Sequence, residues 1–194
     1  MIIRSVKIFL TALILSGYAN SQKNNMSVEY LSTESNDGNL TGYAPVNGLN
    51  MYFEIHGEGT PLVLIHGGGS TIQTTFGKVL NKLAENNKVI AVEMQAHGHT
   101  ADIDRPLSFE KDADDIAELL KYLIIEKANI FGFSNGASTT LQFAIRHPEL
   151  TSKIIVASTF YKKSGAPDWF WEMMAKPTFE GMPHPYKDAF LKNN

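Results

Sequence analysis

A serine lies between two glycines in the stretch KANIFGFSNGAST, which runs from residue 127 to residue 139. The spacing Gly132-x-Ser134-x-Gly136 is typical of a nucleophile on a sharp turn between a strand and a helix. Such a turn strains the serine backbone and lifts the hydroxyl clear of the sheet, while side chains at the two glycine positions would collide with the neighbouring strand and helix. The pattern predicts Ser134 as the nucleophile of an acyl transfer. The alternative interpretation is structural, with Ser134 acting only as a helix cap.

A run of glycines follows an apolar segment upstream, in VLIHGGGST at residues 63–71. Acyl transfer needs two hydrogen-bond donors aimed at the oxyanion of the tetrahedral intermediate. We expect one donor to be the backbone N–H of Asn135, and the other to come from Gly68 or, next in order, from Gly69. A phosphate-binding loop is the rival interpretation, but the Lys-Ser/Thr pair of a P-loop and the Gly-x-Gly-x-x-Gly spacing of a dinucleotide site do not occur here.

Strand-like and helix-like segments alternate around these two motifs. The apolar runs PLVLI, KVIAV, ANIFGF and SKIIVAS are typical of buried strands, and helical spacing of apolar residues follows in segments 70–87, 108–125 and 135–150. Residues 49–56 alternate between apolar and polar, which predicts a half-exposed strand, and His56 precedes an expected hairpin turn. The alternation predicts an α/β fold with a mostly parallel, doubly wound sheet covered on both faces.

Three segments, LVLIHGGGS, VIAVEMQAHGHT and NIFGFSNGAS, resemble the α/β-hydrolase superfamily, in the branch of small esterases, lactonases and cofactor-free haloperoxidase-like enzymes. The middle segment is similar to the family's Asp-x-x-Gly-x-Gly-x-Ser loop, with Glu93, Ala96, Gly98 and Thr100 in those places. The resemblance covers about residues 42–158.

This resemblance implies acyl-enzyme chemistry on a small carboxylic ester, lactone or thioester, with no cofactor and no metal. Dehalogenases and epoxide hydrolases of the same fold carry Asp in place of the nucleophilic serine, so Ser134 argues against those reactions. The alternative, from another class, is a non-catalytic relative that binds a ligand or a partner.

The family order of the catalytic residues is Ser, then an acid, then a late His, and this chain ends before both expected positions. Asp168 and His184 are weak candidates for acid and base. His66 and His97 are expected to hold loops, with substrate contact as the alternative for His97. His56 is expected to be exposed, and His147 to end a helix.

The aromatic and Met-rich segment 159–194 is interpreted as the start of a helical lid or cap. Its apolar side chains are Trp169, Phe170, Trp171, Met173, Met174 and Phe179. We therefore expect the chain to be a C-terminally incomplete hydrolase that lacks the catalytic acid and His and is inactive by itself. In that case the SKIIVAS strand would be a bare sheet edge.

Residues 1–21 have the features of a cleaved signal peptide. Arg4 and Lys7 precede an apolar run at 8–15, and Ala19-x-Ser21 offers a cleavage signal. A membrane anchor is the alternative, but the run is shorter than the roughly 20 residues that a span needs. The sequence therefore predicts a periplasmic or secreted protein without a stable membrane span after cleavage.

Composition limits the remaining possibilities. The 194 residues suit one domain, predicted here as a flexible leader at 22–42 and a core at 43–158. A net charge of -3 gives no reason to expect a nucleic-acid partner, and the absence of cysteine excludes disulfides and thiolate chemistry. A small-molecule substrate is the expected partner, and the oligomeric state is left open.

Overall fold

The computed structural model describes residues 32–34, 39–160, 162–175, 187 and 188 of the chain. The predicted signal peptide and His184 lie outside the described residues. Within the described part, no helix is long and apolar enough to cross a membrane.

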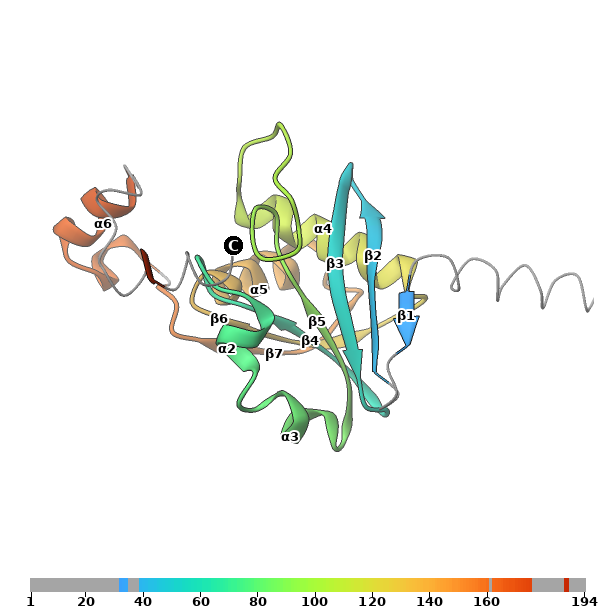
Figure 1. Ribbon diagram of the computed structural model, residues 1–194. Coiled ribbons are helices and arrows are strands. Elements are labelled where there is room, and N and C mark those ends of the chain that lie inside the picture. The colour runs from blue at the N-terminus through green and yellow to red at the C-terminus, as the bar shows by residue number, and fades with distance from the viewer. Residues whose placement is uncertain (1–31, 35–38, 161, 176–186, 189–194) are drawn as a thin grey trace, which may run out of the picture.

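A seven-stranded sheet forms the centre of the described chain, in the order β1-β2-β3-β5-β4-β6-β7 (Figure 1). The strands are β1 (Ser32–Glu34), β2 (Leu40–Val46), β3 (Leu49–His56), β4 (Thr60–Ile65), β5 (Asn87–Val92), β6 (Ala128–Phe133) and β7 (Thr151–Ala157). Strands β5, β4, β6 and β7 run parallel, and β1 to β3 add an antiparallel section beside β5. The predicted α/β class and its parallel core are confirmed.

Helices cover both faces of this sheet (Figure 1). Helices α4 (Phe109–Tyr122) and α5 (Asn135–Arg146) pack on one face, and the short helices α2 (Ile72–Phe76) and α3 (Leu80–Ala84) lie on the other. Ile116, Leu119 and Leu120 repeat at helical spacing within the segment 108–125 that was predicted to be a helix, and all three are fully buried. Ser108 caps α4 by accepting from the Lys111 N–H at 3.2 Å.

The expected hairpin between residues 49–56 and 60–65 is wrong. Strand β5 lies between β3 and β4, so the turn at 57–59 joins strands that do not pair. Local sequence indicates the turn at 57–59 correctly. It cannot indicate that β5, which begins about 30 residues further along the chain, lies between the two strands that this turn connects. The hairpin instead joins β2 and β3, through Asn47 and Gly48 at φ 49° and 84°. An Asn-Gly pair suits such a turn because both central residues need positive φ.

Two further expectations are corrected at their boundaries. The single helix expected over 70–87 is two short helices, because the chain makes a tight turn at Gly77, with Val79 N–H donating to Phe76 O at 2.8 Å. The sheet also begins earlier than the core boundary at residue 43. Leu40 already pairs with Ile55, and β1 pairs with β2, so part of the predicted leader is ordered strand.

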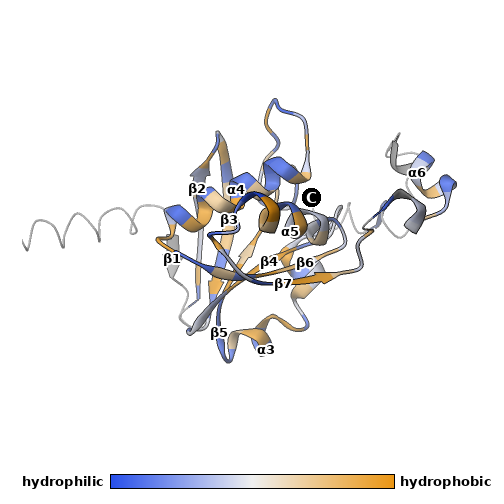
Figure 2. Cartoon of the chain, turned by 180° about the vertical axis from the view of Figure 1, so that it is seen from behind, coloured by the Kyte–Doolittle hydropathy of each residue, from blue (hydrophilic) through white to orange (hydrophobic). Residues whose placement is uncertain are grey.

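Strand β7 ends the sheet, and apolar side chains are exposed on it. Ile154 and Ile155 are 40% and 52% exposed, although they lie in the middle of the strand. Figure 2 shows hydrophobic colouring along β7 at this side of the molecule. Within the described residues, the expected sheet edge is therefore confirmed.

Beyond β7, the chain continues into the short 3-10 helix η1 (Lys163–Gly165) and helix α6 (Asp168–Ala175), which stands apart from the sheet in Figure 1. Aromatic rings pack on one another there, with the Phe160 centroid 5.3 Å from that of Phe170 and 5.5 Å from that of Trp171. Trp169 is 63% exposed. The lid interpretation stays a prediction, and Phe179 lies outside the described residues.

Candidate active site

Ser134 is the single residue between β6 and α5. Its backbone angles are φ 54° and ψ -112°, a conformation that residues with a Cβ rarely adopt. Its N–H donates to Ala157 O on β7 at 2.8 Å, which fixes the turn against the next strand. Although Ser134 stands at the N-cap position of α5, its side chain makes no capping hydrogen bond. The structure thus contradicts the interpretation that this serine is present to cap the helix.

The two glycines of the motif are required by contacts with backbone atoms. A Cβ on Gly132 would lie 2.0 Å from Gly136 O, and a Cβ on Gly136 would lie 2.2 Å from Ile65 O. Neither neighbour is a flexible side chain that could move away. The backbones of β6, α5 and β4 therefore pack so closely beside Ser134 that only glycine fits at positions 132 and 136.

The glycine loop lies directly beside this turn. A Cβ on Gly67 would be 3.5 Å from the Ser134 Cβ, and a Cβ on Gly68 would be 3.5 Å from the Asn135 Cβ. The backbone N–H groups of Gly68 and Asn135 have no hydrogen-bond partner among the described residues. The predicted pair of oxyanion donors, Gly68 and Asn135, is thus brought together next to the serine, with both N–H groups unbonded.

Gly69, the second loop candidate, is in a different situation. Its N–H donates to Nε2 of His97 at 3.1 Å. This amide is therefore already bonded, and Gly68 is the loop donor that the structure leaves available. The contact to His97 supplies a physical reason for the predicted preference for Gly68 over Gly69.

His66 anchors the start of the glycine loop from inside the core. The Met94 N–H donates to its Nε2 at 3.1 Å, so the ring proton is on Nδ1 and is donated to Gly67 O at 2.7 Å. Burial lowers the pKa of His66 to about 4, which keeps the ring neutral at pH 7. Its expected role of holding the loop is confirmed.

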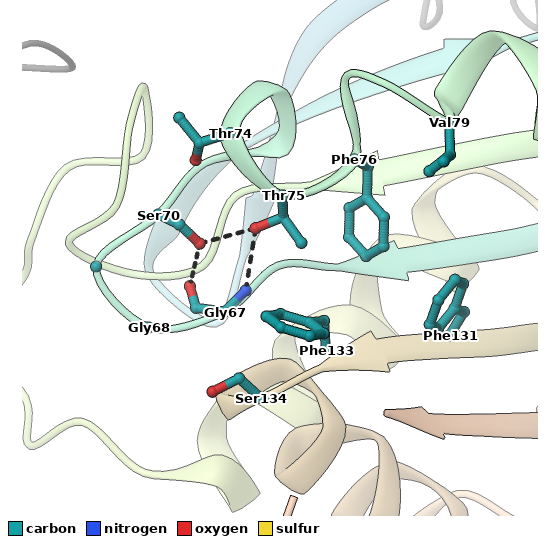
Figure 3. A pocket seen from close by; sticks show the side chains of 11 residues that line it. Gly67, Gly68, Ser70, Thr74, Thr75, Phe76, Val79, Phe131, Phe133 and Ser134 are labelled. Carbon is teal, nitrogen blue, oxygen red and sulfur yellow. Dashed lines mark hydrogen bonds between the residues drawn. The ribbon is translucent and has the colours of Figure 1, made fainter. Parts of the chain in front are cut away.

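Hydroxyl groups complete the support of this loop. Ser70 Oγ donates to Gly67 O at 2.8 Å, and it lies 2.8 Å from Thr75 Oγ1 (Figure 3). Thr75 Oγ1 in turn accepts from the Gly67 N–H at 3.4 Å. Sequence reasoning missed both residues. Ser70 follows the glycine run directly, but Thr75 lies six positions beyond Gly69 within α2, so only the first of them had a local signal.

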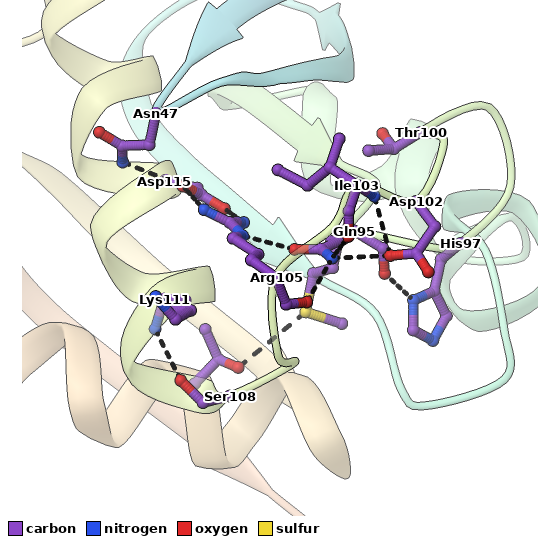
Figure 4. A network of polar contacts seen from close by, with 12 residues as sticks. Asn47, Gln95, His97, Thr100, Asp102, Ile103, Arg105, Ser108, Lys111 and Asp115 are labelled. Atoms are coloured by element: carbon purple, nitrogen blue, oxygen red, sulfur yellow. Dashed lines mark hydrogen bonds and ion pairs between the residues drawn. The ribbon is translucent and has the colours of Figure 1, made fainter.

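The loop after β5 is fixed by the buried carboxylate of Glu93, which occupies the place of the family's Asp. Its Oε2 accepts from the His99 N–H at 2.6 Å, and its Oε1 accepts from the Ile72 N–H at 3.4 Å. A second carboxylate, Asp115 of α4, binds Arg105 through both oxygens (Figure 4). These contacts tie the loop to α2 and to α4, and sequence reasoning did not find the Arg105–Asp115 pair.

None of the described residues offers Ser134 a catalytic base or acid by hydrogen bond. Asp168 is an exposed residue at the start of α6, and His184 is outside the described residues. The described histidines all have other partners: His56 with Glu54, His66 and His97 with the glycine loop, His99 with Glu93, and His147 with Asp114. His56 was expected to be exposed, but its side chain is only 13% exposed because it pairs with Glu54.

A cavity of about 570 Å³ opens beside Ser134, within the size range of small-molecule sites. It is lined by Gly67, Gly68, Gly69, Ser70, Thr74, Thr75, Phe76, Val79, Phe131, Phe133 and Ser134. Figure 3 shows phenyl rings from α2 and β6 along one wall and the hydroxyl groups of the loop at the other end. The described residues contain no group of three or more His, Cys, Asp or Glu that could hold a metal ion.

Comparison with known proteins agrees with this geometry. The sequence model of the α/β hydrolase fold matches residues 60–184, so the chain belongs to the α/β hydrolase family. It is 34% identical over 116 residues to an uncharacterized protein of Mycobacterium tuberculosis, covering 60% of this chain and 34% of that protein. It is also 34% identical over 119 residues to the serine hydrolase BPHL of Homo sapiens, covering 57% of this chain and 40% of that protein.

Solved structures show the same fold. The enol-lactonase from Burkholderia xenovorans LB400 superposes with a TM-score of 0.65 and 27% identity, over 77% of this chain and 58% of that chain. The chain spans about a third to two fifths of the length of the two curated relatives named above. Because several of these relatives are hydrolases, they support the hydrolase class for this protein.

Proposed function

We propose that this protein is an exported serine hydrolase that acts on a small carboxylic ester, lactone or thioester through an acyl-enzyme. One observation carries the proposal. Ser134 is held at φ 54° with a hydroxyl that makes no hydrogen bond to the described residues, beside the unbonded N–H groups of Gly68 and Asn135. Two free donors beside the hydroxyl are what stabilisation of an oxyanion needs, and a strained backbone at a polar side chain is a frequent feature of active sites.

The proposed reaction begins when Ser134 Oγ bonds to the carbonyl carbon and its proton passes to a base. The carbonyl electron pair moves to the oxygen, where the Gly68 and Asn135 N–H groups and the positive end of α5 stabilise the charge. On collapse, the leaving oxygen or sulfur takes the proton from the base and departs as the alcohol or thiol, while the acyl group stays on Ser134. In a second step the base takes a proton from water, which attacks the acyl group, and the returning proton restores the Ser134 hydroxyl as the carboxylic acid leaves. For the acid and base, Asp168 and His184 remain the candidates within this sequence.

The relatives support this choice of reaction without fixing the substrate. BPHL is described as a serine hydrolase, and one structural neighbour is an enol-lactonase. The cavity has an apolar wall formed by Phe76, Phe131 and Phe133. Such a wall favours an apolar acyl or alcohol group in the substrate.

Export is proposed from the sequence of residues 1–21. Cleavage after Ser21 would leave a mature chain that starts at Gln22. Fractionation of cells that express the full chain, with N-terminal sequencing of the product, tests this. An uncleaved Met1 terminus in the cytoplasm would contradict the proposal.

Turnover of p-nitrophenyl esters of graded acyl length tests the reaction. In the protein expressed from the complete gene, called wild type here and below, we expect release of p-nitrophenol with saturation kinetics, and its Ser134→Ala variant should lose this activity. The matched control is Ser138→Ala, which removes a hydroxyl one helical turn away that contacts Thr159. Equal rates for wild type and Ser134→Ala would reject the proposal.

A second candidate is a non-catalytic relative that retains the cavity for ligand binding. It is favoured by one observation, that all five described histidines are bonded to groups other than Ser134. This candidate predicts saturable ester binding without hydrolysis, and equal ester affinity in wild type and Ser134→Ala. Calorimetry beside the turnover assay separates the two functions.

A further inference from the structure

We propose that His97 is a positioning residue that selects Gly68 as the oxyanion donor of the glycine loop, by holding the adjacent Gly69 amide away from the substrate. This inference rests on the proposed function, since an oxyanion forms only if Ser134 attacks a carbonyl. It assigns a role in the reaction to a residue that was expected to hold a loop, with direct substrate contact as the alternative. The argument follows the two peptide units of the glycine loop in turn.

The first peptide unit joins Gly67 to Gly68, and its orientation is set by its carbonyl. Gly67 O accepts from His66 Nδ1 at 2.7 Å and from Ser70 Oγ at 2.8 Å. The peptide bond is trans and planar, so its N–H points away from its carbonyl. Two donors on the oxygen of Gly67 therefore fix the direction of the Gly68 N–H, which is left without a partner among the described residues.

The second peptide unit joins Gly68 to Gly69, and here the N–H is held instead. Glycines on both sides leave this unit free to rotate, and Gly69 has a φ of 63° with no atom within 4 Å of an added Cβ. The described atom that opposes this rotation is Nε2 of His97, which accepts the Gly69 N–H at 3.1 Å. Without that acceptor, both glycine amides could compete for the same oxyanion in several loop conformations.

The orientation of His97 is itself well determined. Its Nε2 accepts from Gly69, so Nδ1 carries the proton and donates it to Gln95 O at 2.8 Å. The ring lies 4.9 Å from the ring of His66. The side chain of Gln95 is buried and is bonded to Asp102 at 2.7 Å and to Arg105 at 2.6 Å (Figure 4). His97 Nε2, the acceptor for the Gly69 N–H, is thus held in place through Gln95 and Arg105, and Arg105 is bonded to Asp115 of α4.

Two substitutions separate this role from simple loop stability. His97→Gln places an amide oxygen near the position of Nε2, which can still accept from Gly69, whereas His97→Leu removes the acceptor. With p-nitrophenyl butyrate, we expect His97→Leu to lower kcat by about 10- to 100-fold with KM changed by less than about 2-fold, because a misplaced donor acts in the transition state. His97→Gln should retain kcat within about 5-fold of wild type.

A second readout needs no turnover. A fluorophosphonate places its phosphoryl oxygen where the oxyanion would lie, so its rate of reaction with Ser134 should fall in parallel with kcat in His97→Leu. The matched control is His56→Leu, which removes an imidazole bonded to Glu54 on β3, away from the loop. It should leave both rates unchanged, and urea unfolding of each variant checks that it is folded.

Three outcomes would overturn the inference. In the first, His97→Leu keeps the wild-type kcat and labelling rate. In the second, His97→Leu changes KM but not kcat. In the third, kcat falls as much in His97→Gln as in His97→Leu. If His97→Leu does not fold, the scalar coupling between Gly69 N and His97 Nε2 across the N–H···N bond in wild-type protein gives the answer, and its absence rejects the inference. If wild type neither turns over ester nor is labelled at Ser134, the proposed function fails. That result differs from the finding of an unbonded Gly69 amide, which would reject only the role of His97.

Discussion

Gly68 and Asn135 lie side by side although 67 positions separate them in the sequence. A Cβ built on Gly68 would be 3.5 Å from the Cβ of Asn135, and the N–H groups of both residues are unbonded within the described chain. The two belong to turns that follow the adjacent parallel strands β4 and β6, which pair from Leu62 to Ile65. The carboxyl ends of parallel strands meet at one edge of a sheet, where ligand sites of α/β folds form.

Replacing Ser134 should reveal the strain stored at this turn. Ser134→Gly should raise the free energy of unfolding by about 1 kcal/mol relative to Ser134→Ala, because the strain that glycine relieves at φ 54° exceeds the larger backbone entropy that glycine loses on folding. Neither variant loses a capping hydrogen bond, since Ser134 makes none. Urea denaturation measures both values. A Ser134→Gly variant that is no more stable than Ser134→Ala would show that the backbone of this turn is not strained.

The close contact at Gly136 predicts a severe effect of one added methyl group. Gly136→Ala would place a Cβ 2.2 Å from the Ile65 carbonyl, so we expect a loss of about 3 kcal/mol or more, or failure to fold. Gly48→Ala is the matched control, because it has a φ of 84° and no atom within 4 Å. It should cost only the backbone term of about 1–2 kcal/mol. Similar losses in both variants would show that the strand–helix contact is not as tight as described.

His66 should make the protein less stable in mild acid. Burial lowers its pKa from 6.5 to about 4 in the folded state, so the unfolded chain binds an extra proton between these values. Stability from this group is therefore present above about pH 6.5 and is lost as the pH falls toward 4, by about 3 kcal/mol in all. Urea unfolding from pH 4.5 to 7 measures the slope. His66→Gln should flatten this slope, and an unchanged slope would contradict the assignment.

Asp112 should make the protein less stable as the pH rises, which is the opposite of the effect of His66. Burial, with the neighbouring charge of Asp115, raises the pKa of Asp112 from 3.8 to about 7. Stability is then lost as the pH rises from about 4 through 7, because the folded state resists ionisation of this carboxyl. Asp112→Asn should therefore stabilise the protein at pH 8, by about 2–4 kcal/mol, and have little effect at pH 4.

The control for Asp112 is Asp114→Asn, in which a carboxylate of the same helix loses its pairs with Arg146 and His147. Those pairs lower the pKa of Asp114, so its removal should destabilise the protein at pH 8. If Asp112→Asn behaved in the same way, the buried carboxyl would have to be ionised and paired in the folded state.

Local signals in the sequence were sufficient to predict the elements closest to the site. The Gly132-x-Ser134-x-Gly136 spacing and the apolar runs before it predicted the turn between β6 and α5, because sterics within a few residues decide that geometry. The helical spacing of apolar residues in segment 108–125 predicted α4 for the same reason.

Long-range pairing could not be predicted from the same signals. The insertion of β5 between β3 and β4 depends on residues about 30 positions apart. The contact between Gly69 and His97 spans 28 positions and joins two loops that have no periodic pattern. Such contacts follow from how the strands pair in the sheet, and a short segment of sequence does not determine that pairing.

The most direct test of the account is the covalent labelling of the nucleophile. Wild-type protein is incubated with a fluorophosphonate, and the modified residue is located by peptide mass spectrometry, with Ser134→Ala as the control. The account predicts a single adduct on Ser134 and none in the variant. An unlabelled wild-type protein, or equal labelling of wild type and Ser134→Ala, would contradict the claim that this strained serine is the nucleophile.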